Sequence, residues 1–77
     1  MKCQEVLGEV FRQVFANSRL IISPDLTPNE IDGWDSMAHV KLIAAVELRF
    51  KIKFDGKELR KIRTVGDLGQ LIDGKLP

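Results

Sequence analysis

The chain has 77 residues, 44% of them hydrophobic and 30% charged, and its net charge at pH 7 is +1. A chain this short predicts one domain, spanning residues 1–77, that buries about 60% of the surface exposed by its unfolded form. Twelve basic residues nearly balance eleven acidic ones, which excludes the strongly basic composition typical of nucleic-acid-binding domains. We therefore expect an ordinary globular domain, monomeric, with a thin core and no nucleic-acid partner.

Cysteine content and hydropathy further restrict the class of protein to which the chain can belong. The single cysteine, Cys3, excludes an internal disulfide and a cysteine-rich metal site, and we expect it to be a free thiol near a frayed N-terminus. The sequence contains no run of about 20 apolar residues that would span a membrane. Its first ten residues include Glu5 and Glu9 and lack the apolar core of a signal peptide. These features predict a cytoplasmic protein without stable membrane association and without a metal site.

The first predicted element is a helix over residues 2–16. Its apolar residues recur three and four positions apart, which is the spacing of one helix face. They are Val6, Leu7, Val10, Phe11, Val14 and Phe15. Asn17 and Ser18 end this pattern.

Residues 17–35 predict an unusually long connection, because no helical period continues through Pro24 and Pro28. The segment Thr27–Glu30 has the sequence of a single capped turn, with threonine as cap and glutamate three residues later. Connections of this length in small domains are often functional or held by their own side chains. The candidate anchors are Leu20, Ile22, Leu26, Ile31 and Trp34.

The turn at residues 32–34 precedes a second helix over residues 36–50. Asp35 or Ser36 can act as its N-cap, since either side chain can accept a hydrogen bond from a free N–H of the first turn. Apolar residues occur on more than one side of this helix, which predicts a central position with neighbouring elements covering it. These residues are Met37, Val40, Leu42, Ile43, Ala44, Ala45, Val46, Leu48 and Phe50.

Two shorter helices are predicted after residue 50. Residues 51–54 alternate polar and apolar side chains, but we interpret them as a loop because no second strand is available for pairing. Asp55 would cap a short helix over residues 56–62. Thr64 and Asp67 resemble a capping box at the start of the last helix, whose apolar residues are Val65, Leu68, Leu71 and Ile72. Gly74 is its expected end.

Ser36 stands out because it lies at a helix N-terminus, where unpaired N–H groups and the helix dipole favour a phosphate. The sequence Asp35-Ser36-Met37, with Gly33-Trp34 before it and Val46-Glu47 and Phe50 after it, resembles the acyl carrier protein family. In that family the serine of an Asp-Ser-Leu motif carries a phosphopantetheine arm. The resemblance implies an all-α, four-helix acyl-carrier-like bundle with three longer helices, one short helix and a long first loop.

The resemblance also implies a function for Ser36. A phosphopantetheinyl transferase would attach 4′-phosphopantetheine from coenzyme A, making the chain a phosphoprotein. The thiol of the arm would then carry acyl intermediates as thioesters between acyl-loading and acyl-processing enzymes of fatty-acid, lipid or polyketide-type synthesis. The chain offers no convincing base or metal for attack on coenzyme A. We therefore expect a carrier without catalytic residues rather than an enzyme.

Further residues gain expected roles from the same resemblance. Asp35 would serve as cap and recognition residue, and Met37 stands in the position of the family's leucine. Val40, Lys41 and Leu48 would belong to the face that docks partner enzymes. A slot for an acyl chain between the second and third helices would be lined by Met37, Val40, Ile43, Ala44, Leu59 and Ile62. Simple core packing explains these residues equally well, and the pattern does not separate the two interpretations.

The charge of the second and third helices differs from the family pattern, which is strongly acidic. Lys41, Arg49, Lys51, Lys53 and the cluster Lys57, Arg60, Lys61 and Arg63 are basic. Docking between proteins is steered by complementary charge. We therefore expect a specialised carrier from a dedicated pathway, although a solvated basic face without a partner is the alternative.

Three other functions remain as alternatives. An aminoacyl or peptidyl carrier is disfavoured by Trp34-Asp35 before the serine. An unmodified helical protein-interaction module would keep the fold and use Leu48 and the basic face. A hydrolase built from Asp35, Ser36 and His39 is disfavoured because residues three apart on a helix rarely form a triad. We expect His39 to be solvated and Trp34 to anchor the loop.

Overall fold

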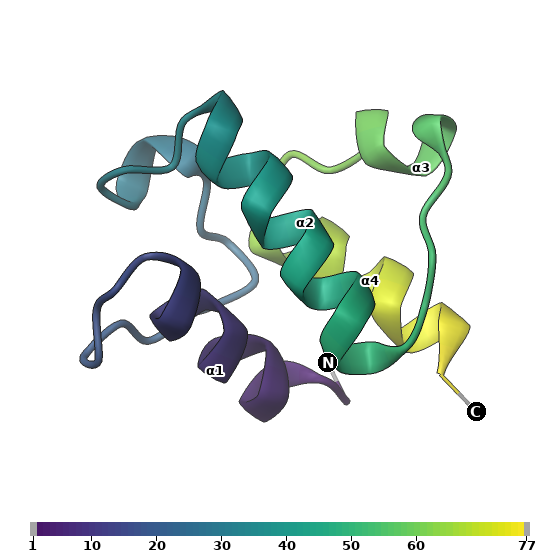
Figure 1. Cartoon of the computed structure of the whole chain (residues 1–77), viewed down its shortest axis with the longest axis horizontal. Coiled ribbons are helices and arrows are strands. Elements are labelled where there is room, and N and C mark those ends of the chain that lie inside the picture. Colours follow the sequence, from purple (N-terminus) through teal and green to yellow (C-terminus); the bar gives the residue numbers. More distant parts are fainter. Residues whose placement is uncertain (1, 77) are drawn as a thin grey trace.

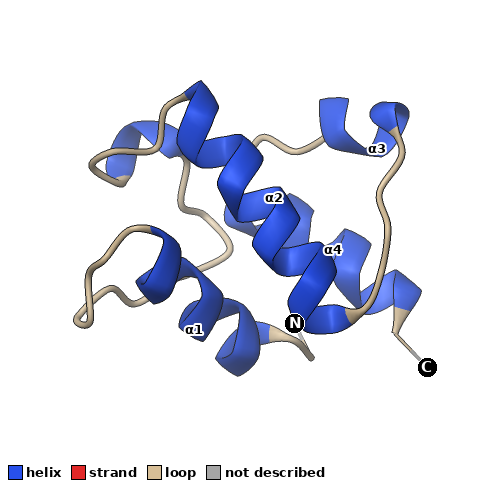
Figure 2. Cartoon of the chain, in the orientation of Figure 1, coloured by secondary structure: helices blue, strands red, loops and turns tan. Residues whose placement is uncertain are grey.

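The computed structural model describes residues 2–76, and they form four α-helices joined by loops (Figures 1 and 2). Within this part of the chain there is no strand, so the prediction of an all-α, four-helix fold is confirmed. The helices are α1 (Gln4–Val14), α2 (Ser36–Phe50), α3 (Gly56–Arg60) and α4 (Val65–Lys75), and a 3₁₀ turn, η1 (Pro28–Glu30), lies between α1 and α2.

Helix α2 crosses the middle of the bundle, with α1 at its lower left, α4 behind it and α3 at the upper right of the view (Figure 1). The core is made by one face each of α1, α2 and α4, together with residues of the first connection. Its fully buried side chains are Leu7, Phe11, Leu42, Val46, Val65, Leu68 and Ile72. Helix α3 contributes no fully buried side chain and lies at the edge of the bundle.

Helix α1 is shorter than predicted, spanning residues 4–14 rather than 2–16. Its end is a left-handed turn at Ala16, which has a φ of 50°. The N–H groups of Ala16 and Asn17 donate to the carbonyls of Gln13 and Arg12 at 3.3 and 3.0 Å. This is the hydrogen-bond pattern of a Schellman motif, so backbone geometry at Ala16 ends the helix before Asn17 and Ser18.

The first connection is anchored as the sequence predicted. Ile22, Ile31 and Trp34 are buried, and Leu20 and Leu26 are half-buried against the same core. Polar contacts from α1 and α4 also hold this connection. Gln4 Nε2 donates to the Ile22 carbonyl and Arg12 Nη1 to the Leu20 carbonyl, at 3.0 and 3.1 Å. The N–H groups of Val65 and Gly66 donate to the Leu26 and Pro24 carbonyls, both at 2.9 Å.

The predicted turn at Thr27–Glu30 forms, but its cap differs from the prediction. The Thr27 hydroxyl does not accept from the backbone; it donates to Glu30 Oε1 at 3.4 Å. The turn is closed by the Glu30 N–H, which donates to the Thr27 carbonyl at 3.0 Å. A single 3₁₀ turn can be closed by such a backbone bond alone.

The segment between α2 and α3 is a loop, as interpreted from the sequence, and it places Ile52 and Phe54 half-buried against the core. Asp55 and Glu58 form a reciprocal capping box at the start of α3. Helix α3 ends at Arg60 rather than at residue 62. The N–H groups of Lys61 and Ile62 bond three residues back, at 3.1 and 3.3 Å, which tightens the last turn and ends the helix.

Helix α4 begins with the predicted capping box between Thr64 and Asp67. It continues through Gly74 to Lys75, so Gly74 does not end it. The expectation of a frayed N-terminus is also wrong from residue 2 onward. Asp73 of α4 accepts from the backbone N–H groups of Lys2 and Cys3 at 2.9 and 3.1 Å, and Cys3 is a free but buried thiol.

Candidate functional site

A tight turn immediately precedes the start of α2. The Trp34 N–H donates to the Ile31 carbonyl at 3.3 Å, and Gly33 within this turn has a φ of 86°. This left-handed conformation is one that glycine adopts without the steric penalty of a side chain. The turn buries Trp34 and leaves Asp35 and Ser36 exposed at the end of the helix.

Asp35, rather than Ser36, is the N-cap of α2. Its Oδ1 accepts from the Ala38 N–H at 2.8 Å, and its backbone is extended. A carboxylate in this position pairs a free N–H group and complements the positive end of the helix dipole. Because Asp35 makes the cap, the hydroxyl of Ser36 does not serve as one and stands exposed on the first residue of the helix.

Trp34 and His39 form a pair that lines the same hollow as Ser36. Trp34 Nε1 donates to His39 Nδ1 at 3.1 Å, and the two rings are stacked with centroids 6.0 Å apart. Trp34 also packs edge-on against Phe11, with ring centroids 5.5 Å apart. The expectation that Trp34 anchors the loop is confirmed. The expectation that His39 is solvated is wrong, since it is half-buried and hydrogen-bonded.

This pairing argues against a hydrolytic triad. A neutral imidazole has one acceptor nitrogen, and in His39 it is already occupied by the Trp34 N–H. The Asp35 carboxylate is turned to the Ala38 N–H instead of to His39. A triad requires the histidine to accept from the serine and to be oriented by the acid. Asp35, Ser36 and His39 lie close together without making this arrangement.

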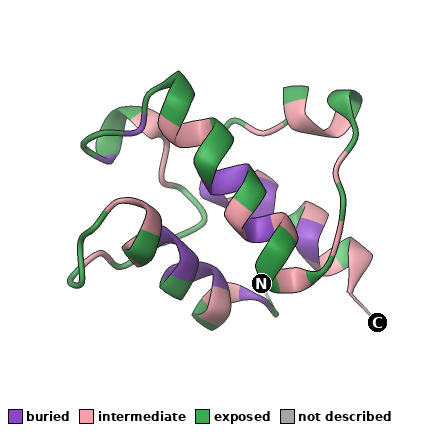
Figure 3. Cartoon of the chain, viewed as in Figure 1, coloured by how far each residue is buried: buried purple, intermediate pink, exposed green. Residues whose placement is uncertain are grey.

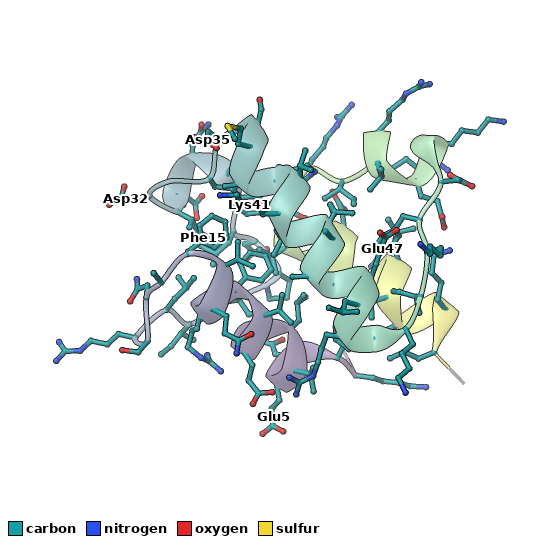
Figure 4. The ribbon with its side chains drawn as sticks, viewed as in Figure 1. Glu5, Phe15, Asp32, Asp35, Lys41 and Glu47 are labelled. Carbon is teal, nitrogen blue, oxygen red and sulfur yellow. The ribbon has the colours of Figure 1, made fainter. Side chains whose placement is uncertain are left out.

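Ser36 lies on the edge of a shallow hollow whose other walls are Pro28, Trp34, Asp35 and His39. The sequence did not predict that Pro28 lines this hollow, because the proximity of η1 to the start of α2 depends on the path of the whole first connection. A second hollow lies toward α1 and involves Phe15, Asp32, Met37 and Lys41. In Figure 4, Phe15 and Lys41 lie on the α1 side of α2, while Glu47 lies on the opposite side.

The residues predicted to recognise partners share the outer face of α2. Met37, Val40 and Leu48 are 71%, 68% and 82% exposed, and Asp35 and Lys41 are exposed as well. Spacings of four and seven residues place Met37, Lys41 and Leu48 along one side of the helix. The predicted central position of α2 is confirmed, but neighbouring elements cover only its core side, which buries Leu42, Ile43 and Val46, and the outer side stays open (Figures 1 and 3).

The residues of the predicted acyl slot lie in different surroundings. Ile43 is buried, and Leu59 and Ile62 are half-buried against the core. Val40 and Ala44 are exposed on the outer side of α2. An acyl chain entering between α2 and α3 would therefore pass from Val40 and Ala44 toward Ile43, and this slot remains a prediction.

The geometry defines a class of protein: a small helical bundle that presents a serine at the N-terminus of its central helix. No family model matches the chain, and no curated protein matches it. Among solved structures, the holo acyl carrier protein from Geobacter metallireducens is 41% identical, with a TM-score of 0.92. The match covers 97% of this chain and 86% of that one. The chain therefore belongs to the acyl carrier protein family.

The similarity extends over the first connection and all four helices, because it covers nearly the whole chain. The structure it matches was determined in the holo form. Within residues 2–76, none of the helices combines the length and apolar character that crossing a membrane requires.

Proposed function

We propose that this protein is an acyl carrier whose Ser36 is modified with 4′-phosphopantetheine. The observation that carries the proposal is the exposed Ser36 on the first residue of α2, with the cap made by Asp35 instead. The attached phosphate would sit at the positive end of the helix dipole, where an anion is stabilised. Membership of the acyl carrier protein family, and the similarity to a holo form, support the same assignment.

In the modification, the Ser36 oxygen attacks the phosphorus that bears the pantetheine of coenzyme A. The bond between the two phosphates breaks, the nucleotide part leaves, and the serine proton passes to a base. Asp35 and His39, the two candidate bases nearest in sequence, are both occupied by hydrogen bonds. A phosphopantetheinyl transferase must therefore supply the base and the metal ion.

The loaded arm would carry acyl groups as thioesters between enzymes of fatty-acid, lipid or polyketide-type synthesis. Trp34-Asp35 before the serine favours an acyl cargo over an aminoacyl or peptidyl one. The basic residues of α2 and α3 favour a dedicated pathway over general fatty-acid synthesis, because docking depends on complementary charge. Normal turnover of the loaded protein by standard fatty-acid synthase enzymes would contradict this second point.

The test is intact mass after incubation with coenzyme A, magnesium and a broad-specificity phosphopantetheinyl transferase. We expect the native chain to gain one phosphopantetheine and Ser36→Ala to gain none. Ser18→Ala, which removes another exposed serine, should be modified like the native chain. A folded native chain that gains no mass, even with the transferase of its own host, would instead favour an unmodified interaction module.

A further inference from the structure

Charge is unevenly distributed along this chain although its net charge is nearly zero. Residues 36–63, which contain α2 and α3, carry eight basic and three acidic residues. Residues 1–35 carry three basic and six acidic residues. The two segments therefore carry net charge of opposite sign, and such a separation of charge can orient an approaching protein.

The three carboxylates within residues 36–63 are all occupied by local structure. Glu47 accepts from the Phe54 N–H at 2.9 Å, and Asp55 accepts from the Glu58 N–H at 2.8 Å. Glu58 accepts from the Asp55 N–H at 3.0 Å and pairs with Lys75 at 3.0 Å. These carboxylates secure the loop and α3, so they do not pair with the basic side chains beside them.

Most basic residues of the same segment are left without an acidic partner. Arg49 pairs with Glu9 at 3.1 Å. No described carboxylate lies within ion-pair distance of the other basic residues that follow it. We call these exposed residues the basic edge: Lys51, Lys53, Lys57, Arg60, Lys61 and Arg63. Figure 4 shows nitrogen-tipped side chains projecting outward from α3.

The basic edge adjoins the exposed apolar side of α2. Ala44, Leu48, Lys51 and Lys53 line one shallow hollow together with Glu47 and Ile52. Leu48 is 82% exposed, and burial of such an apolar side chain in a partner would be favourable. An apolar centre with a charged rim is the composition of a protein docking surface.

We propose that the outer face of α2 and the basic edge dock proteins with an acidic surface around an apolar recess, and exclude proteins whose docking surface is basic. This proposal rests on the proposed function, because α2 also presents Ser36, and it names the chemistry of the partners. Unpaired lysines and arginines attract an acidic surface and repel a basic one. Leu48 would fill the recess of the partner.

A folded protein fits this face better than an anionic lipid surface. Helices that lie in a membrane interface use large apolar side chains, with tryptophan and phenylalanine prominent among them. The large apolar side chains exposed on α2 are Met37, Val40 and Leu48, without an aromatic residue. The hollow beside Leu48 is suited to receive a side chain from a partner.

The test uses two forms of one phosphopantetheinyl transferase: a native form with a basic docking surface, and a form with those basic residues replaced by glutamate. Binding and loading of Ser36 are measured for the native chain and for K51E/K53E at several salt concentrations. We expect the native chain to bind the glutamate-substituted form of the transferase with a Kd about tenfold lower than for the basic form, and to be loaded by it with a kcat/KM about tenfold higher. We expect K51E/K53E to reverse this preference, and added salt to reduce both preferences.

One control variant and one second edge variant complete the test. K2E/R19E lowers the net charge by the same amount on the opposite half of the chain and should behave like the native chain. K53E/K57E avoids Lys51, which has a left-handed backbone at the end of α2, and keeps the test valid if K51E/K53E folds poorly. Thermal unfolding of each variant confirms that it is folded.

The proposal would be overturned if the native chain and both edge variants showed the same preference between the two forms of the transferase. So would charge-dependent binding to vesicles of phosphatidylcholine and phosphatidylglycerol without any effect of transferase charge, which would identify a lipid surface as the occupant. Failure to load Ser36 while binding still follows charge would contradict the proposed function and leave the docking proposal supported.

Discussion

At the scale of single residues, Asp35 combines two roles that a substitution can separate. Its Oδ1 accepts from the Ala38 N–H at 2.8 Å, which is a contribution to stability. Its negative charge lies exposed beside Ser36, where it can be recognised by a transferase. Asparagine retains the capping oxygen and removes the charge, whereas alanine removes both.

We therefore expect Asp35→Ala to lower the free energy of unfolding by about 1 kcal/mol, because an N-cap is lost. Asp35→Asn should cost less than half of that. Urea unfolding of the two variants measures this difference. Loading of Ser36 provides the second measurement: if the charge is recognised, both variants should be loaded slowly. Normal loading of Asp35→Asn would restrict Asp35 to its capping role.

At the scale of elements, the start of α4 is fitted closely against the first connection. The Gly66 N–H donates to the Pro24 carbonyl at 2.9 Å. A Cβ on Gly66 would lie 2.9 Å from that same carbonyl oxygen and 3.1 Å from Pro24 Cβ. At Gly74, near the other end of α4, the corresponding position has no atom within 4 Å apart from its chain neighbours and the nearby backbone of its own helix.

Gly66→Ala and Gly74→Ala therefore make a matched pair within one helix. We expect Gly66→Ala to lower the free energy of unfolding by about 1–3 kcal/mol, because the Pro24 backbone must move away. Gly74→Ala should raise it by up to about 1 kcal/mol, since alanine favours the helix and meets no obstacle. Chemical denaturation of both variants and of the native chain measures these changes in the free energy of unfolding. A loss of stability in both would mean that α4 tolerates no added side chain at either end.

At the scale of the whole molecule, Asp73 joins the two ends of the described chain. It accepts from the N–H groups of Lys2 and Cys3, some 70 residues away in sequence. Partial burial acts to raise the pKa of Asp73, but hydrogen bonds from Cys3 and Lys2 outweigh it, and the pKa lies below its ordinary value. Burial, together with the neighbouring Asp73, raises the pKa of the Cys3 thiol to about 12, which keeps this thiol protonated and unreactive at neutral pH.

The lowered pKa of Asp73 predicts a pH dependence of stability. A carboxylate whose pKa is lower in the folded state stabilises the fold above its unfolded pKa of about 3.9, and this contribution disappears as the pH falls through the folded value. We expect Asp73→Asn to be less stable than the native chain near neutral pH. The difference should shrink as the pH falls below about 4. Unfolding free energies of both chains between about pH 6 and about pH 2 provide the measurement. A difference that is constant over this range would show that Asp73 acts without its charge.

Much of the fold was readable from the sequence because its signals are local. The capping box of Thr64 and Asp67 and the cap at Asp55 involve partners three residues apart. The apolar period of residues 6–15 and the buried positions Ile22, Ile31 and Trp34 also follow from short segments. Asp35-Ser36-Met37 marked the candidate site for the same reason. The positions of all four helices thus depended on interactions within one or two helical turns.

Other features were decided only by the tertiary structure, because their partners are distant in sequence, or because they depend on the path of a turn or on which side of an element is covered. The bond from Trp34 to His39 depends on the turn at Gly33. The anchoring of Lys2 and Cys3 by Asp73 joins opposite ends of the chain. The apolar composition of α2 does not show by itself which of its side chains are covered: Leu42 and Val46 are buried whereas Leu48 is exposed, because α1, α4 and the loops cover one side of this helix and leave the other open. A sequence pattern shows which residues share a helix face, whereas the packing of the other elements determines which face meets water.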